Sequence, residues 1–194
     1  MFAEKTGQDA APIYEEIIRK IPHQQFTFGK IWIAFATYYL RQGNLDKARK
    51  TFGLALGKAP RPSIFAAYTN LELQLVEIDR CRKIQEKFLE TFPNSAKAWT
   101  SYAQFEAALE ETERARAIYQ LAVQQEDMEM PELVWKAFIE FEIANGENLR
   151  VKQLYEELLQ SSDHVKVWIS YGCWLFGVNK KEREAARAVF KRGY

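Results

Sequence analysis

Residues 99–119, WTSYAQFEAALEETERARAIY, contain the pattern that decides the fold. Bulky side chains follow Trp99 at three and six positions, at Tyr102 and Phe105, which is the spacing of the buried face of an amphipathic helix. A polar link comes next, and a second apolar pattern begins at Ala115. This stretch therefore predicts two α-helices joined by a short turn.

The same pattern recurs along the chain with a period near 34 residues. An aromatic residue opens each unit, at Trp32, Phe65, Trp99, Trp135 and Trp168, with spacings of 33, 34, 36 and 33 residues. In four units the second helix has a small or slim residue followed at once by a cation, at Ala48-Arg49, Cys81-Arg82, Ala115-Arg116 and Val151-Lys152. An aromatic four positions later, as at Tyr119 and Tyr155, completes the motif. We interpret these recurring positions as packing positions of a helical-repeat solenoid.

The register divides the chain into repeats. We expect one array over residues 1–194, with a half repeat at 10–22 and hairpins at 30–60, 62–93, 96–125, 131–161 and 164–194. The half repeat lacks its leading helix, and the last repeat is not followed by a polar capping helix. We therefore expect the chain to be an internal fragment of a longer protein.

Composition limits the possible functions. Only 9 Gly and 6 Pro are present, too few for the turns of a β-sandwich, so an all-α fold is favoured. The net charge of +1 lacks the basic excess of a typical nucleic-acid binder. No apolar run reaches membrane-spanning length. Cys81 and Cys173 lie far apart in apolar helical contexts, which favours free thiols in a reducing compartment.

Opposite charges recur beside the apolar pattern. Seven residues after the aromatic, three units carry a glutamate, and a cation follows ten residues later in the second helix. If each hairpin turns midway, the two side chains lie level. We therefore predict an ion pair inside each of three repeats, Glu72 with Arg82, Glu106 with Arg116, and Glu142 with Lys152. Repetition favours a structural role, because catalytic sites are few per protein.

No chemical site emerges from the remaining residues. The run Gly53 to Lys58 departs from a phosphate loop in spacing and lacks its Ser or Thr, so we interpret its glycines as allowing close helix packing. His23 and His164 do not pair with the cysteines at zinc-site spacings. We expect no enzyme activity, metal, cofactor or small-molecule substrate. One low-ranked contact surface for RNA is the basic cluster Lys180, Lys181, Arg183, Arg187 and Lys191.

The period, the aromatic stripe and the small residue before a cation together resemble the tetratricopeptide (TPR) class. The glutamate in the first helix of the hairpin resembles the HAT (half-a-TPR) branch of that class. The segments Ile21-Pro22-His23, Leu71 to Lys83, Met130-Pro131-Glu132 and His164 to Ser170 are similar to the crooked-neck family of pre-mRNA splicing factors. Departures from the pattern are Phe65 for tryptophan, Gln85 for an aromatic, and two additional residues in both the link at 124–130 and the fifth hairpin.

The resemblance implies a right-handed TPR-like superhelix of antiparallel hairpins. It also implies a nuclear scaffold that binds other spliceosomal proteins in the NineTeen-associated complex. Two alternatives stay open at this point. One is an RNA-binding module that uses the basic cluster, and the other is a HAT scaffold of RNA 3′-end processing, where such arrays form homodimers.

Overall fold

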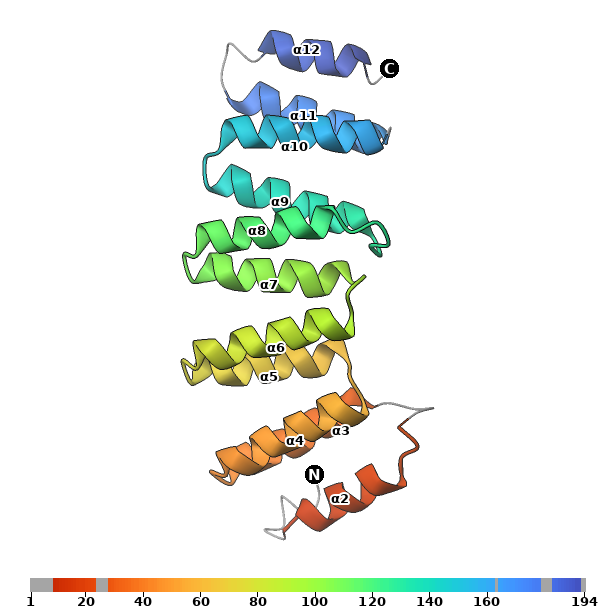
Figure 1. Cartoon of the computed structure of the whole chain (residues 1–194), viewed down its shortest axis with the longest axis vertical. Helices are drawn as coiled ribbons and strands as arrows, with labels where there is room; N and C mark the ends of the chain where they lie inside the picture. Colours follow the sequence, from red (N-terminus) through yellow and green to blue (C-terminus); the bar gives the residue numbers. More distant parts are fainter. Residues whose placement is uncertain (1–8, 24–27, 163, 179–182, 193–194) are drawn as a thin grey trace. The chain divides into compact units, whose positions relative to one another are not determined.

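The computed structural model describes residues 9–23, 28–162, 164–178 and 183–192, which form eleven α-helices and contain no strand (Figure 1). The prediction of an all-α fold built from helical hairpins is confirmed. The helices are α2 (Ala11–Lys20), α3 (Gly29–Arg41), α4 (Leu45–Lys58), α5 (Pro62–Gln74), α6 (Ile78–Thr91), α7 (Ala96–Ala108), α8 (Thr112–Val123), α9 (Pro131–Ala144), α10 (Asn148–Ser161), α11 (Val165–Val178) and α12 (Arg183–Arg192).

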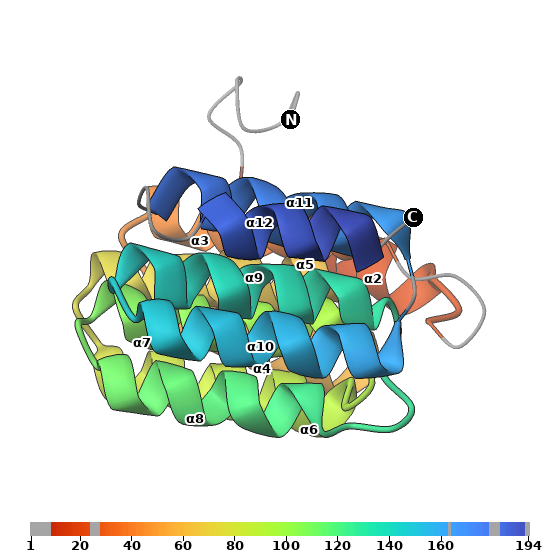
Figure 2. The same ribbon diagram turned by 90° about the horizontal axis from the view of Figure 1, so that it is seen from above.

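The chain divides into two compact units, Met1–Tyr102 and Ala103–Tyr194, and the division falls within α7. In the first unit α3 pairs with α4, α5 pairs with α6, and α2 packs on α3. In the second unit α9 pairs with α10 and α11 with α12, and Figure 2 shows α11 and α12 side by side.

Stacked aromatic rings join each hairpin to the next within a unit. The aromatic of one second helix stacks on the residue three positions after the opening aromatic of the following hairpin. The stacked pairs are Tyr14–Phe35 with ring centroids 5.1 Å apart, Phe52–Tyr68 at 5.0 Å, Tyr119–Phe138 at 5.2 Å and Tyr155–Tyr171 at 4.7 Å. Such a pair contributes about 0.5–1.5 kcal/mol beyond its area burial.

The second hairpin departs from this pattern because Gln85 replaces the aromatic. The Ser101 hydroxyl donates a hydrogen bond to Gln85 Oε1 over 3.3 Å, so Gln85 makes a polar contact with α7. Phe65 instead stacks on Phe88 of the same hairpin, with centroids 4.7 Å apart. Ala98 of α7 is buried against this cluster.

The first helix of four hairpins is followed, two residues after its last residue, by a residue with left-handed backbone, eleven positions after the opening aromatic. These residues are Gly43 (φ 71°), Val76 (φ 58°), Glu110 (φ 62°) and Gly146 (φ 75°). Glycine adopts this conformation freely, whereas a β-branched residue such as Val76 pays a steric cost. Glycine at positions 43 and 146 is the residue type that this backbone favours, whereas Val76 and Glu110 give no such signal in the sequence.

Glycines inside helices play different roles. A Cβ added at Gly172 of α11 would come 2.5 Å from the Phe190 ring of α12, so Gly172 permits the close approach of these two helices. Gly53 and Gly57 of α4 face open space, with no heavy atom within 4 Å of an added Cβ. The interpretation of these two glycines as close-packing positions is therefore wrong, because they lie on the outer face of α4.

Candidate functional site

The recurring glutamate is placed by the end of the first helix of its hairpin. At Glu142 the backbone carbonyl accepts a hydrogen bond from the backbone N–H of Glu147 over 3.0 Å, which closes the left-handed turn at Gly146. The carbonyls of Glu72 and Glu106 accept equivalent bonds, over 2.9 and 3.0 Å. All three glutamates are fully buried. The turn therefore fixes the backbone while the carboxylate remains available to a partner.

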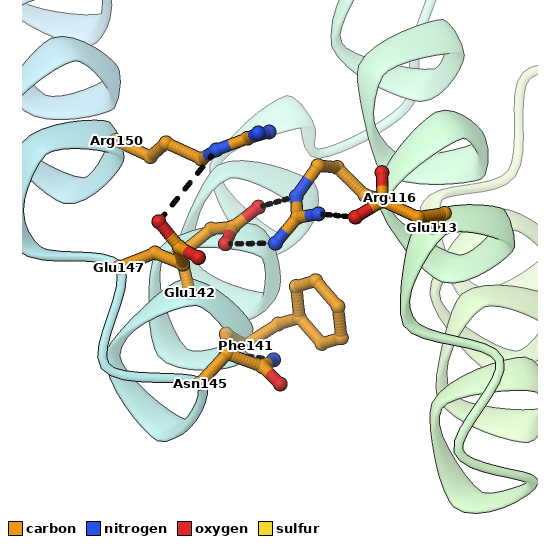
Figure 3. A network of polar contacts seen from close by, with 7 residues as sticks. All are labelled: Glu113, Arg116, Phe141, Glu142, Asn145, Glu147 and Arg150. Carbon is orange, nitrogen blue, oxygen red and sulfur yellow. Dashed lines mark hydrogen bonds and ion pairs between the residues drawn. The ribbon is translucent and has the colours of Figure 1, made fainter.

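That partner at Glu142 is Arg116 of α8 (Figure 3). Arg116 Nε donates to Glu142 Oε1 over 2.6 Å and Nη2 donates to Oε2 over 2.9 Å, which is a bidentate pair. Glu113 accepts a further bond from Nη1, and the Phe141 ring lies 5.9 Å from the guanidinium carbon. The pKa of Arg116 is raised, first by its hydrogen bonds to Glu142. The guanidinium therefore stays charged although it is only 4% exposed.

Arg49 of α4 binds Glu72 of α5 in the same way. Nε donates to Oε1 over 2.8 Å and Nη2 donates to Oε2 over 2.7 Å. Glu77 lies 3.6 Å from the same Nη2, and hydrogen bonding to Glu72 raises the pKa of Arg49. Both bidentate pairs thus connect the second helix of one hairpin to the first helix of the next.

The predicted ion pairs within each repeat are therefore wrong. Glu72 is bound by Arg49 and not by Arg82. Glu142 is bound by Arg116 and not by Lys152. Because Arg116 is committed to Glu142 and Glu113, it does not pair with Glu106, whose Oε1 lies 3.4 Å from Arg114.

The cause of the difference is the geometry of an α-helix. Ala48 and Ala115 are completely buried, and Ala48 shares a core cluster with α3 of its own hairpin. The following residue is turned by about 100° around the helix axis, since an α-helix has ~3.6 residues per turn. Arg49 and Arg116 consequently face the next hairpin instead of their own.

The pairs have no capacity for acid or base catalysis in this arrangement. Both oxygens of Glu72 and Glu142 accept bonds from a guanidinium, so neither carboxylate faces an open site. What the arrangement can do is hold neighbouring hairpins in one register. A bidentate guanidinium fixes orientation as well as distance.

The other predicted packing positions differ in their burial. Trp32, Phe65, Ala48, Ala115, Tyr119 and Tyr155 are buried, whereas Trp99, Trp135 and Trp168 are half-buried. Trp99 Nε1 donates to the Pro93 carbonyl over 2.7 Å, and the guanidinium carbon of Arg192 lies 5.4 Å from the Trp168 ring centroid. Both contacts join residues of the chain to one another, which is consistent with a packing role for these tryptophans.

Of the predicted basic cluster, Arg183, Arg187 and Lys191 are exposed on α12, and Arg183 lies over the Phe176 ring at 5.0 Å. Lys180 and Lys181 lie outside the described residues. In the described residues, no group of three His, Cys, Asp or Glu side chains is arranged as a metal site, and no helix is both long and apolar enough to cross a membrane.

One further feature was missed by sequence reasoning: an open groove of about 670 Å³ in the first unit. Its floor is α3, and its walls are one face of α2 and one face of α4. The lining combines buried aromatic side chains with several cations, and Leu54 on the α4 wall is 57% exposed. The signal in the sequence was the spacing of Lys47, Lys50, Leu54 and Lys58, which places them on one helix face.

Comparison with known proteins agrees with these hairpins. Residues 55–171 match a family model described as "Pre-mRNA-splicing factor Syf1/CRNKL1 C-terminal HAT repeat". A solved structure titled "Functional Characterization of Pseudomonas Aeruginosa pilF" aligns with a TM-score of 0.50 and 20% identity, covering 86% of this chain and 76% of that one. At that identity the likeness shows the fold alone.

Two relatives cover nearly the whole chain. "Protein crooked neck" of Drosophila melanogaster is 48% identical over 98% of this chain and 28% of its own length. "Pre-mRNA-splicing factor clf1" of Aspergillus fumigatus is 45% identical over 95% of this chain and 30% of its own length. The chain thus spans less than a third of either relative. With the family model matched over more than half of its residues, the chain belongs to the HAT-repeat family of crooked-neck-like pre-mRNA-splicing factors.

Proposed function

We propose that the chain is a non-enzymatic scaffold segment that holds other proteins of the spliceosome during pre-mRNA splicing, in the NineTeen-associated complex. The observation that carries the proposal is the match of residues 55–171 to a splicing-factor HAT model. The bidentate links support it, because they join neighbouring hairpins in each unit and leave the outer helix faces for partners. The site of action is the nucleus.

The proposal includes the organisation of the chain. The half repeat at 10–22 and the hairpins at 30–60, 62–93, 96–125, 131–161 and 164–194 act as successive units of one array. Each hairpin buries its apolar face against its neighbours, so removal of one repeat exposes the faces of two others. The oligomeric state stays open in this proposal.

The test is affinity purification of the tagged full-length protein from nuclear extract, followed by identification of the proteins that accompany it. We expect splicing proteins in the purified fraction. A second purification uses the full-length protein with residues 10–194 deleted, and we expect it to lose a subset of those partners. Recovery of no splicing proteins by the intact protein would overturn the proposal.

An RNA-binding function is the second candidate, and the exposed cations of α12 favour it. Arg183, Arg187 and Lys191 occupy one short helix, although Glu184 lies among them. Phosphate contacts make affinity fall steeply with salt concentration, so titration with a labelled single-stranded RNA at low and moderate salt decides the matter. Absence of binding at low salt would eliminate this candidate.

A further inference from the structure

The groove between α2 and α4 combines an apolar floor with a rim of unpaired cations. Trp32, Phe35 and Tyr39 of α3 form the floor, and Ile18 of α2 lies on the wall beside it. The rim carries Arg19, Lys47, Lys50 and Lys58 against a single carboxylate, Glu15. Within the described residues, none of these four cations is in an ion pair, although Lys47 Nζ lies 5.4 Å from the Tyr39 ring centroid. Arg49 and Arg116, in contrast, each bind a carboxylate through two hydrogen bonds. The groove is thus locally basic in a chain whose net charge is only +1.

The dimensions of the groove define the size of its occupant. The lining positions on α4 run from Lys47 to Lys58, so the groove is about 16 Å long at ~1.5 Å per residue. That length matches about three turns of a helix laid along it. A volume of about 670 Å³ admits the side chains of one helix face and not a whole helix. Exposed Leu54 offers an apolar contact on the wall.

We propose that this groove binds an acidic amphipathic helix of a partner protein, with its apolar face on the α3 floor and its carboxylates against the lysines of α4. Such helix-in-groove recognition uses anchors at i, i+3 or i+4, and i+7. The alternative occupant, single-stranded RNA, fits the groove less well. Stacking of bases needs open ring faces, and Trp32, Phe35 and Tyr39 are each at most 9% exposed.

The test uses fluorescence anisotropy with the whole chain and a labelled synthetic peptide of about 14 residues, with leucines at i, i+4, i+7 and i+11 and glutamates elsewhere. The groove variant is Lys50→Glu with Lys58→Glu. The matched control is Lys83→Glu with Lys97→Glu, which changes the same net charge at exposed positions outside the groove lining. We expect the groove variant to weaken binding roughly tenfold or more and the control to change it less than ~3-fold.

A second variant, Leu54→Ser, removes the apolar contact without changing charge and is expected to weaken the same peptide. Far-UV circular dichroism confirms that each variant is folded. Equal affinity of the groove and control variants for the peptide would overturn the proposal. So would tighter binding of a labelled oligouridine that the groove variant abolishes, or self-association of the chain that the groove variant abolishes.

The inference deepens the proposed scaffold role, yet its test is independent of it. Peptide binding is measured with purified components, whereas the scaffold role is measured by the proteins that accompany the full-length protein. If Lys50→Glu with Lys58→Glu loses the peptide but splicing proteins are absent from the purification, the scaffold proposal alone fails. If splicing proteins are recovered but no variant affects the peptide, the groove proposal alone fails.

Discussion

Replacement of Glu142 by glutamine tests the strongest polar link in the structure. Glu142 is completely buried and Arg116 is 4% exposed, so the substitution removes the buried counter-ion of the guanidinium and leaves only the solvent-exposed carboxylate of Glu113. Removing one partner of a buried pair costs about 3–5 kcal/mol. We expect a loss near the lower end, because the glutamine oxygen still accepts one of the two bonds. Against a typical total of about 5–15 kcal/mol, this is a large fraction of the stability of a domain.

The control for this variant lies five residues along the chain. Glu147 pairs with Arg150 at 3.9 Å, and the two side chains are 48% and 44% exposed (Figure 3). Glu147→Gln makes the same chemical change in a solvated pair, and we expect a loss of at most about 1 kcal/mol. The backbone hydrogen bond from Glu147 to Glu142 is retained in both variants.

The assay is equilibrium urea unfolding of the whole chain followed by far-UV circular dichroism. Because the chain contains two compact units, hydrogen exchange is measured as well, to show where the loss is located. We expect the protection of α8 and α9 to fall more than that of α11 and α12. In a double-mutant cycle, Arg116→Met with Glu142→Gln should cost less than the sum of the single changes. Equal losses for Glu142→Gln and Glu147→Gln would show that the buried pair contributes no more than the exposed one.

Three further predictions concern the backbone and a buried phenol. Val76→Gly should raise the free energy of unfolding by about 1 kcal/mol, because Val76 is 77% exposed and has φ 58°; a loss in urea unfolding would contradict this. Gly172→Ala should cost about 1–3 kcal/mol by crowding Phe190, whereas Gly177→Ala, which faces open space, should not destabilise the chain in a thermal melt. Burial raises the pKa of Tyr119 to about 12, so its ionisation is disfavoured in the folded chain. The free energy of unfolding is therefore unaffected by Tyr119 ionisation below pH ~10. It falls by up to about 2–3 kcal/mol as the pH rises toward 12, because the phenol ionises more readily in the unfolded chain. Tyr119→Phe should therefore be the more stable protein at pH 11 in urea unfolding, and equal stability at that pH would count against the shift.

The fold was predictable because residues that are buried in the same way in every repeat form a recurring sequence pattern. A hairpin that stacks on copies of itself needs bulky and small residues at fixed positions, and these appear as the register of Trp32, Phe65 and Trp99. Helix type and hairpin pairing follow from that register. The left-handed backbone at Val76 and Glu110 could not be predicted from residue type, because neither type favours that conformation. The only indication was that both residues occupy the same repeat position as Gly43.

The partners of the recurring charges were harder to predict. Sequence register identifies Glu72 and Glu142 as special positions, but it does not say which hairpin supplies the cation. That choice depends on the angle around the second helix at which Arg49 and Arg116 project. The burial of Ala48 and Ala115 fixes this angle once the small residue is known to face its own hairpin. The groove was missed for a similar reason, because its cations come from α2 and α4 and become neighbours only when both helices pack on α3.

The junction between α2 and α3 uses a different link. In the register of α2 the cation position is Ala11, and the glutamate position of α3 is Tyr39, so both members of the buried pair are replaced together. Instead, Asp9 accepts hydrogen bonds from the Ala11 backbone N–H over 3.0 Å and from the Tyr38 hydroxyl over 2.7 Å, and these bonds lower the pKa of Asp9. A solvated carboxylate contributes less than a buried bidentate pair.

These three polar links differ in burial. The pair in α8 and α9 is the more buried, the pair in α4 and α5 is partly open at Arg49, and the link of α2 to α3 is exposed. Local opening costs least where few buried contacts resist it. The groove lies beside the most exposed of these three polar links, and a docked helix would add apolar contacts to both α2 and α4. A partner that binds only the folded arrangement of α2, α3 and α4 would stabilise that arrangement.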